Sequence, residues 1–425
     1  MKTNVLFILI CFALNTTLFA TDQVVTNNDN SGSGSLRQAI VDAGDGDEIT
    51  FNLASGNETI TISSEISISE SLTINGSNES GSGVDVTVQV TSPGTSTFRV
   101  FNINAIGKTI TIENMTIKGG DISGESGNDS YGGGIAVFAG SLYLDIVIVS
   151  GSKSRYGGGV FADSGGNIYI NRSTINNNET TYSGGGIRIA SSANSNLEIT
   201  NSTISNNTSD DYGGGVSVGT GNNSVSISNT TISNNVSSGY GGGVSLSSSS
   251  TLESVTISNN HTDNNDNSST ETGGGLYIYD GIQNLKNCLI ANNYNGSGTA
   301  TGDDLSYREG TVTDNGYNVV KHQSPGQYFN DNTSIIFDAD YWRLIVTYDP
   351  PLDNQTLDLA SGLSYSGGYT ETVAVTGGGF LTEAEGYGST TKITDQRGYY
   401  RTSSAITRGA YQYNGVVAKI GSGTS

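Results

Sequence analysis

The feature that most constrains the fold of this chain is a glycine triplet that returns at an almost constant interval. Gly-Gly-Gly followed by an aliphatic residue occurs six times, with steps of 25, 27, 29, 28 and 32 residues. The triplets begin at Gly132, Gly157, Gly184, Gly213, Gly241 and Gly273. A period of this length is typical of proteins that stack one structural unit upon another. We therefore interpret the chain as a repeat protein rather than as a globule with one central core.

Each period contains three short segments in which aliphatic and polar residues alternate. In the period that begins at Gly213, these segments are 216–218, 225–227 and 231–235. Alternation with period two is typical of β-strands, and no segment has the spacing or the length of a helix. Strands too short to be stable alone predict one coil of a parallel β-solenoid, in which each strand pairs with its equivalent one coil away.

Equivalent residues of successive coils should stack about 4.8 Å apart along the solenoid axis. We expect an inward column of isoleucines followed by a column of asparagines, which can hydrogen-bond along the axis and adopt a left-handed corner. The isoleucines are Ile175, Ile204, Ile232, Ile257 and Ile290. The asparagines are Asn177, Asn206, Asn234, Asn259 and Asn292. A second inward column should contain Val160, Ile187, Val216, Val244 and Leu276. Each triplet should form a tight turn with positive φ.

The first twenty residues predict export of the protein. A basic start, a short apolar stretch at 5–14 and a small-residue cleavage site ending at Ala20 are typical of a secretion signal. No later stretch approaches the roughly 20 apolar residues of a transmembrane helix, so we expect a secreted protein or one at the outer-membrane surface. Cys288 is the only cysteine after the signal, which excludes an intramolecular disulfide.

The chain after the signal divides into a cap, a series of coils and a less regular end. The segment 35–44 predicts a short capping helix, because Ser35 and Gln38 form a capping box and Gly44 stands where such a helix ends. The period disappears after about residue 295. We assign 1–20 to the signal peptide, 21–48 to the N-terminal cap, 49–295 to β-helix coils, 296–414 to irregular late coils and a C-terminal cap, and 415–425 to a flexible tail.

The charge balance excludes several partners. The chain has 18 Lys and Arg against 40 Asp and Glu, a net charge of −22, so we expect no nucleic-acid partner and no binding to anionic lipid. His261 and His322 are the only histidines, which gives little support to a histidine metal site or a Ser-His-Asp triad. We expect no organic cofactor, since the triplets lack the lysine of a phosphate-binding loop.

Calcium is the one metal for which the sequence offers candidate ligands. Paired carboxylates beside asparagine carbonyls suit a hard cation, although solvated turns on an acidic protein are the favoured explanation. The candidate ligands are Asp210, Asp211, Asp303 and Asp304, with Asp263 and Asp266 as a further pair.

Residues beside the triplets and at the coil turns are the candidates for binding or catalysis. Glycoside hydrolysis needs two carboxylates about 5 to 9.5 Å apart, but Asp163 and Asp211 do not recur as a pair, and we predict no catalytic residue. The cations for a lyase would be Arg155, Arg172 and Arg188. Four tyrosines form either a sugar-stacking row or a packing ladder: Tyr131, Tyr156, Tyr212 and Tyr240. A threonine column could act as an ice-binding array: Thr174, Thr203, Thr231 and Thr256.

Both ends of the mature chain and its repeats resemble known bacterial surface proteins. The segment 34–40 (GSLRQAI) followed by 47–51 (DEITF) is similar to the opening of exported right-handed parallel β-helix proteins, and the repeats resemble those of polymorphic outer membrane proteins. The segments 394–398 (TDQRG) and 408–413 (RGAYQY) resemble the C-terminal part of the choice-of-anchor Q domain. The resemblance implies a bacterial surface or secreted protein whose fold is shared by polysaccharide enzymes and adhesins.

The predicted fold class is all-β: a single-stranded right-handed parallel β-helix, or pectin-lyase-like solenoid, with a short N-terminal capping helix. We expect a monomeric, non-catalytic module that is adhesive or associated with the envelope and binds an extracellular polysaccharide or a cell-surface ligand. The alternative is a polysaccharide lyase or glycoside hydrolase on the same fold. A carboxylate pair beside a cation-lined groove would favour the enzyme, and a bare, regular, glycine-rich side would favour the adhesin.

Overall fold

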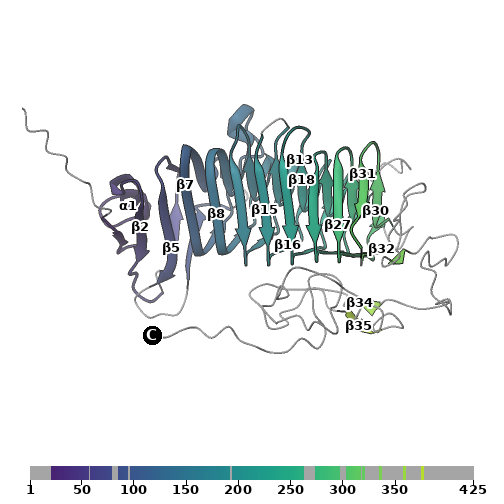
Figure 1. Ribbon diagram of the computed structural model, residues 1–425. Coiled ribbons are helices and arrows are strands. Elements are labelled where there is room, and N and C mark those ends of the chain that lie inside the picture. The colour runs from purple at the N-terminus through teal and green to yellow at the C-terminus, as the bar shows by residue number, and fades with distance from the viewer. Residues whose placement is uncertain are drawn as a thin grey trace, which may run out of the picture.

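The structure is a computed structural model, and the residues it describes form an elongated stack of strands (Figure 1). It describes residues 21–56, 58–78, 85–93, 96–191, 194–262, 273–296, 303–316 and 318–320, and the strand backbones at 335–336, 358–359 and 375–377. The expected secretion signal, most of the expected C-terminal cap and the expected tail at 415–425 lie outside the described residues.

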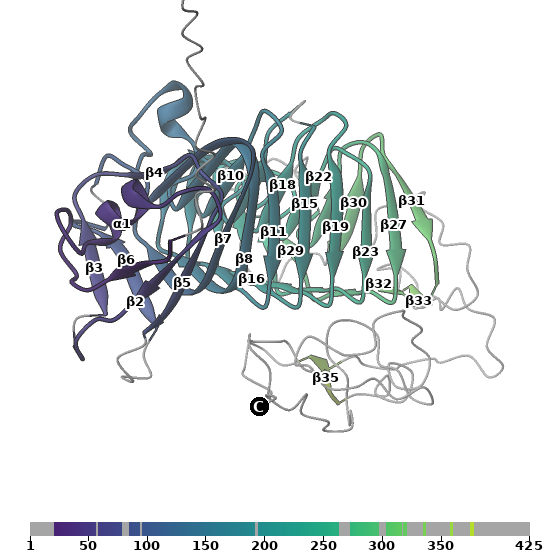
Figure 2. The same cartoon turned by 60° about the vertical axis from the view of Figure 1, so that its left-hand side comes forward.

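The stack is a parallel β-solenoid in which the strands of each coil pair with those of the next. Two long strands, β7 (Phe101–Lys118) and β8 (Ile135–Ser150), turn the corners and contribute to three columns of strands. We call these columns sheets 1, 2 and 3 in the order in which a coil enters them. Figure 2 shows how they run side by side along the axis.

Sheet 1 follows the glycine triplets and is built from three-residue strands. Besides the first parts of β7 and β8, it contains β4 (Ile66–Ile68), β10 (Val160–Ala162), β14 (Ile187–Ile189), β18 (Val216–Val218), β22 (Val244–Leu246), β26 (Leu276–Ile278) and β30 (Leu305–Tyr307).

Sheet 2 has the longest regular strands and starts the solenoid. Besides the middle parts of β7 and β8, it contains β1 (Gln23–Val25), β2 (Asp47–Phe51), β5 (Leu72–Asn78), β11 (Asn167–Asn171), β15 (Asn196–Thr200), β19 (Ser224–Ser228), β23 (Ser250–Glu253), β27 (Ile282–Lys286) and β31 (Thr311–Asp314). The strands β1 and β31 lie in segments that the sequence assigned to the cap and to the late coils, so the regular stack extends beyond 49–295 at both ends.

Sheet 3 carries the isoleucine column. Besides the last parts of β7 and β8, it contains β3 (Thr59–Ile62), β6 (Val86–Val90), β12 (Thr174–Asn176), β16 (Thr203–Ser205), β20 (Thr231–Ser233), β24 (Thr256–Ser258), β28 (Leu289–Ala291), β32 (Val319–Val320) and β33 (Ile335–Ile336).

A fourth, very short column was not expected from the sequence pattern. It lies between sheet 3 and the next triplet and contains β9 (Lys153–Tyr156), β13 (Glu179–Ser183), β17 (Thr208–Ser209), β21 (Val236–Ser237), β25 (His261–Thr262) and β29 (Tyr294–Asn295). Strands of two residues carry too little alternation to be recognised in a sequence. Two further strands, β34 (Asp358–Leu359) and β35 (Val375–Gly377), pair antiparallel with each other.

One short helix lies at the N-terminal end of the stack (Figure 1). Ser35 caps helix α1 (Leu36–Asp42) by accepting a hydrogen bond from the backbone N–H of Gln38, and the helix ends at Ala43. Three of its apolar side chains are buried in the core, whereas Val41 is exposed: the buried ones are Leu36, Ala39 and Ile40. A single 3₁₀ turn, η1 (Gly127–Ser130), precedes the first triplet. No helix in the described part of the chain is long and apolar enough to cross a membrane.

The inward columns fill the solenoid with aliphatic side chains. Ile175, Ile204, Ile232, Ile257 and Ile290 pair in register, and all are fully buried. The side chains of the column in sheet 1 are also fully buried: Val160, Ile187, Val216, Val244 and Leu276. Because each such side chain is worth about 1.5–3 kcal/mol when fully buried, these columns carry much of the stability of the stack.

Asparagines shape the corner after sheet 3 in two different ways. Asn177, Asn206, Asn234, Asn259 and Asn292 all have a positive φ, between 55° and 63°, and form the left-handed corner itself. The buried amide ladder lies one residue further along the chain, on Asn178, Asn207, Asn235, Asn260 and Asn293. A left-handed residue redirects the chain, and this places the next side chain inside the solenoid.

The ladder satisfies backbone groups that the corner would leave unpaired. Asn235 donates through Nδ2 to Asn260 Oδ1 and to the Ile204 carbonyl, both at 2.9 Å. Its own Oδ1 accepts from the backbone N–H and the Nδ2 of Asn207, both at 3.0 Å. The last rung is Asp304, whose Oδ1 accepts both bonds from Asn293 at 2.7 Å.

The glycine triplets allow neighbouring coils to approach closely. The first glycine of each triplet has a positive φ, as at Gly213 (63°), which confirms the predicted turn. A Cβ atom on the second glycine, Gly214, would lie 2.5 Å from the carbonyl oxygen of Gly242 in the next coil. A larger residue would therefore push the coils apart.

We predict that Asn235→Ala destabilises the solenoid strongly. The substitution removes the acceptor of two donors on Asn207 and a donor to the Ile204 carbonyl, all of them buried. Each buried polar group left unpaired costs about 1–3 kcal/mol, so we expect a loss of about 3 kcal/mol or more in the free energy of unfolding, measured by urea denaturation. Ser226→Ala, at an exposed position of β19, is the control. Equal stability of the two variants would show that the ladder contributes little.

Candidate functional site

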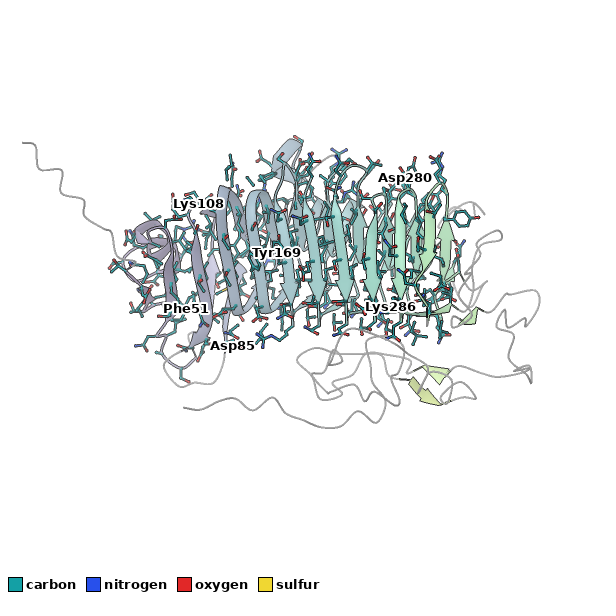
Figure 3. The ribbon with its side chains drawn as sticks, in the orientation of Figure 1. Phe51, Asp85, Lys108, Tyr169, Asp280 and Lys286 are labelled. Carbon is teal, nitrogen blue, oxygen red and sulfur yellow. The ribbon has the colours of Figure 1, made fainter. Side chains whose placement is uncertain are left out.

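A groove interrupts the outer side of sheet 2 where β7, β8 and β11 run next to each other. It has a volume of about 350 Å³. Its lining side chains come from equivalent positions of four neighbouring coils, the fourth being that of β15, and include Thr111, Glu113, Tyr143, Asp145 and Tyr169. Figure 3 shows Tyr169 on the broad side of the solenoid.

Two tyrosines form the most prominent feature of the groove. Tyr143 and Tyr169 pair in register, and their rings stack with centroids 4.4 Å apart and an angle of 7° between the planes. They point outward because their neighbours in sequence, such as Leu142 and Leu144, point into the core. Tyr143 is 40% exposed. One face of the Tyr143 ring lies against Tyr169. The other face is turned toward the preceding coil, where the register partner on β7 is the smaller Thr111.

Three carboxylates surround the tyrosine pair. Glu113 and Asp145 are register partners on β7 and β8, which places their Cα atoms about 4.8 Å apart. Glu198 is the register partner of Tyr169 on β15.

The Asp145 carboxylate is held in place by two neighbours. Arg172 Nε donates to Asp145 Oδ1 at 2.8 Å, and Arg172 Nη2 forms an ion pair with Asp145 Oδ2. Asn171 Nδ2 also donates to Asp145 Oδ1, at 2.9 Å. The groove therefore contains a carboxylate fixed by an arginine directly beside a second carboxylate, Glu113.

The surroundings of the groove change the acidity of two of its side chains. Partial burial raises the pKa of the Glu113 carboxyl, and the nearby charges of Asp145 and Glu48 raise it further, while Arg172 lowers it. Partial burial also raises the pKa of the Tyr143 hydroxyl, as do its contacts with Tyr169. Glu113 thus keeps its proton to a higher pH than a solvated glutamate.

The calcium candidates Asp303 and Asp304 use their carboxylates within the fold. Asp303 accepts hydrogen bonds from the backbone N–H of Gly273 and from the Ser306 hydroxyl, both at 2.5 Å, and its burial raises its pKa. Asp304 ends the asparagine ladder. Both side chains therefore have a structural role in the last coils.

The calcium candidates Asp210 and Asp211 belong to no cluster of acidic ligands among the described residues. Asp210 and Asp211 are neighbours at the turn before the triplet of Gly213, and the Asp211 carbonyl accepts bonds from the backbone of Gly239 and Tyr240. Within the ranges that the structure describes, no three His, Cys, Asp or Glu side chains lie close enough together to hold a metal ion. The pair Asp263 and Asp266 lies outside those ranges.

The tyrosines that precede the triplets pack against the outer side of sheet 1. Tyr131 stacks on Phe161 with ring centroids 4.6 Å apart, and Tyr240 contacts Tyr277 at 4.7 Å. Phe161 and Tyr277 are both buried. These tyrosines therefore form a second layer of rings over sheet 1. Of the two interpretations of the tyrosines, this arrangement favours the packing ladder over the sugar-stacking row.

The structure does not bring the three candidate arginines together. Arg155 lies over the rings of Tyr156 and Tyr182, at 5.5 and 6.0 Å from their centroids. Arg188 donates to the Ser217 hydroxyl on the outer side of sheet 1, and its burial lowers its pKa. Of the three, Arg172 contacts the groove, through its bonds to Asp145.

Two other arrangements that the sequence left open as alternatives are not formed. Asp163 lies in the turn that leaves sheet 1, whereas Asp211 lies before sheet 1 is entered, so the two carboxylates occupy different corners of the solenoid. The threonine column is in register, but Thr203, Thr231 and Thr256 are buried. A flat, exposed threonine array is therefore absent at these three positions.

The sequence analysis missed the residues of the groove because they break the repeat. Tyr143 and Tyr169 have no aromatic equivalent in the next coil, where Glu198 takes their place. Tyr143 follows the start of its triplet, Gly132, by 11 residues, whereas Tyr169 follows Gly157 by 12. Aligning the periods on their triplets therefore leaves the tyrosines one position apart, and only the strand pairing places them on one row.

The match to one protein family supports the fold. Residues 133–315 match a family described as "Right handed beta helix region". The crystal structure of the Dettilon tailspike protein (gp208) is similar with a TM-score of 0.38 and 10% sequence identity, over 74% of this chain and 66% of that chain, so this chain spans slightly less than two thirds of its length. No curated protein matches the chain. The resemblances to the choice-of-anchor Q domain and to polymorphic outer membrane proteins stay predictions. The predicted fold class is confirmed: the protein is an all-β, right-handed parallel β-helix.

Proposed function

We propose that this protein is an extracellular β-helix module that binds glycans at the groove on the outer side of sheet 2. The observation that carries the proposal is the exposed ring of Tyr143. Because its register partner Thr111 is small, space is left beside one face of the ring, next to polar side chains, and we call this space the slot. The C–H face of a sugar ring packs well against an aromatic ring, while its hydroxyl groups bond to carboxylates and amides at the edges.

The charges of the groove favour an uncharged glycan. Glu113, Asp145 and Glu198 line it, and the neighbouring cation Arg172 is engaged with Asp145. The net charge of −22 adds a repulsive background for polyanions. Adhesion to a surface that displays neutral polysaccharide is consistent with this chemistry and with the export expected from the first twenty residues.

We predict that Tyr143→Ala weakens glycan binding about tenfold or more. The substitution removes the aromatic ring, and a tenfold loss corresponds to about 1.4 kcal/mol. Binding of the full chain would be measured by calorimetry on a panel of neutral and acidic polysaccharides.

Two further variants make this test specific. Tyr143→Phe keeps the ring and should retain most of the affinity. Thr251→Ala lies on the same row of sheet 2, at an exposed position of β23, and should behave like the unmodified protein. A folded protein that binds no polysaccharide on the panel, or equal binding by Tyr143→Ala, would contradict the proposal.

Glycoside hydrolysis is the alternative function, and one observation favours it. Glu113 and Asp145 are adjacent, Arg172 fixes Asp145, and the raised pKa of Glu113 suits a proton donor. Two carboxyl groups of which one is an acid and the other an anion are the requirement of a glycosidase. Release of reducing ends by the purified chain that disappears in Glu113→Gln would establish the enzyme. Binding without release would leave the module non-catalytic.

We predict that Glu113→Gln stabilises the protein near neutral pH. The pKa of Glu113 is higher in the folded than in the unfolded state, so the stability that it contributes at low pH is lost as the pH rises through the folded-state pKa. Glutamine does not ionise and avoids this loss. We therefore expect a higher melting temperature for Glu113→Gln than for the unmodified protein at about pH 7, and no gain at about pH 3. An equal gain at both values would mean that charge is not the cause.

A further inference from the structure

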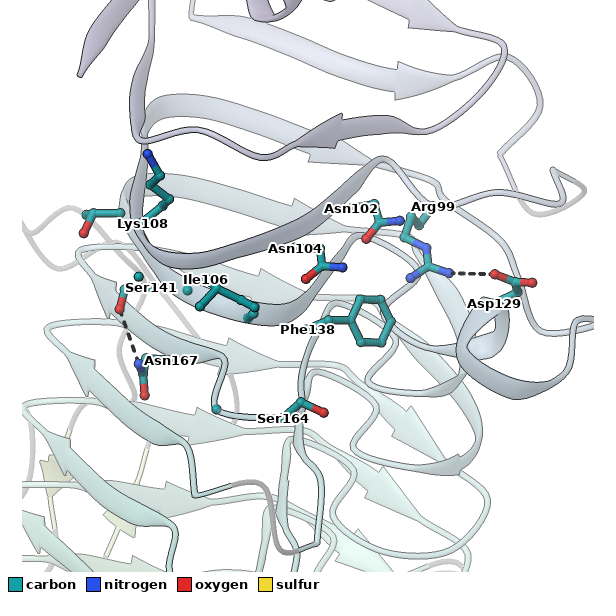
Figure 4. A pocket seen from close by; sticks show the side chains of 15 residues that line it. Arg99, Asn102, Asn104, Ile106, Lys108, Asp129, Phe138, Ser141, Ser164 and Asn167 are labelled. Carbon is teal, nitrogen blue, oxygen red and sulfur yellow. Dashed lines mark hydrogen bonds and ion pairs between the residues drawn. The ribbon is translucent and has the colours of Figure 1, made fainter. Parts of the chain in front are cut away.

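The outer side of sheet 2 carries a second, larger hollow beside the groove. It has a volume of about 740 Å³ and lies where the chain turns from sheet 1 into sheet 2. In Figure 4 Phe138 lies in its middle, with Ile106 and Asn104 on one side and Arg99 on the other.

The hollow and the groove are neighbours on the same strands. Ser141 and Asn167 line the hollow, and each precedes a groove tyrosine, Tyr143 or Tyr169, by two residues. Two residues of a strand span about 6.6 Å and point to the same side. Asn167 Nδ2 donates to Ser141 Oγ at 3.3 Å, which joins the two polar side chains at the edge of the hollow that adjoins the groove. The hollow and the groove therefore follow each other along the strands, perpendicular to the solenoid axis.

The cations of the hollow are matched by carboxylates of the chain itself. Arg99 Nε lies 3.2 Å from Glu65 Oε2, and Arg99 Nη2 lies 4.0 Å from Asp129 Oδ1. Lys108 Nζ is bound by two carboxylates, Asp45 at 2.9 Å and Glu70 at 3.0 Å. Four carboxylates thus balance two cations, which gives an anionic ligand no electrostatic advantage.

The remaining chemistry of the hollow combines an apolar surface with amide and hydroxyl groups. Phe138 is half-buried under the Arg99 guanidinium, 5.6 Å from its ring centroid, and the Ile106 side chain is 84% exposed at the rim. The exposed Asn104 amide lines the hollow on the same side as Ile106, and the Ser141 hydroxyl lies on the floor. An acetamido group matches this set, because its methyl group can cover the apolar surface while its N–H and C=O bond to amides.

We propose that the hollow over Phe138 is a second subsite of the glycan site and takes an N-acetylated hexosamine unit. The inference rests on the proposed function, since it extends a glycan seated at Tyr143. A linear oligosaccharide then lies along the strands, perpendicular to the solenoid axis, with one unit in the slot over Thr111 and the following units over Ser141 and Phe138.

The test uses the full chain and β-1,4-linked N-acetylglucosamine oligomers from the dimer to the hexamer, with affinities measured by calorimetry. We expect the affinity to rise about tenfold between the dimer and the tetramer. Phe138→Ala should abolish this rise and leave the affinity for the dimer unchanged. Ile106→Ser probes the same subsite at an exposed position, where folding is not at risk, and Ile282→Ser, which changes an isoleucine that is 51% exposed on β27, is its matched control.

The outcomes separate the subsite from the function on which it rests. An affinity that is the same for all lengths, or a rise that persists in both Phe138→Ala and Ile106→Ser, would overturn the second subsite. Binding of another glycan at Tyr143 without any binding of these oligomers would overturn the acetamido assignment and leave the proposed function standing. Absence of binding to every glycan tested would overturn both.

Discussion

Each coil of this protein supplies the hydrogen-bond partners of the next coil, and the rest of the structure depends on this mutual pairing. The strands have two to five residues in most coils and could not exist alone. Where the strands stop, the pairing continues through the buried asparagine ladder from Asn178 to Asn293 and ends on Asp304. The triplets allow the same continuity on the other side, because glycine lets two backbones approach where a Cβ atom would collide with a carbonyl oxygen.

This construction separates the inside of the solenoid from its outside. An inward position must hold a side chain that packs against or hydrogen-bonds to its equivalents in the neighbouring coils, as the aliphatic columns and the asparagine ladder do, since a gap or an unpaired polar group would disturb both neighbours. An outward position has no such constraint and can differ from coil to coil. The groove uses that freedom: Thr111, Tyr143, Tyr169 and Glu198 occupy one outward row, and their differences in size create the slot beside Tyr143.

The same separation explains which expectations the structure supports and which it changes. Ile232 and its equivalents could be recognised because an inward column repeats in sequence as well as in space. The amide ladder could be expected only approximately, since Asn234 and Asn235 look alike in the sequence and differ in backbone conformation: the first adopts φ of 59°, and the second is turned inward as a result. The two-residue strands were missed because their pairing, not their pattern, defines them.

The sequence alone determined that the chain is a β-solenoid, where its coils begin and which aliphatic side chains fill it, because repeated local patterns encode contacts between equivalent residues. Only the tertiary structure decided which unlike residues meet. Glu113, Asp145 and Arg172 come from two strands and a corner, and stacking of the coils brings them together with Tyr143. A binding surface of this kind rests on contacts across coils between residues that do not repeat, so no period in the sequence announces it.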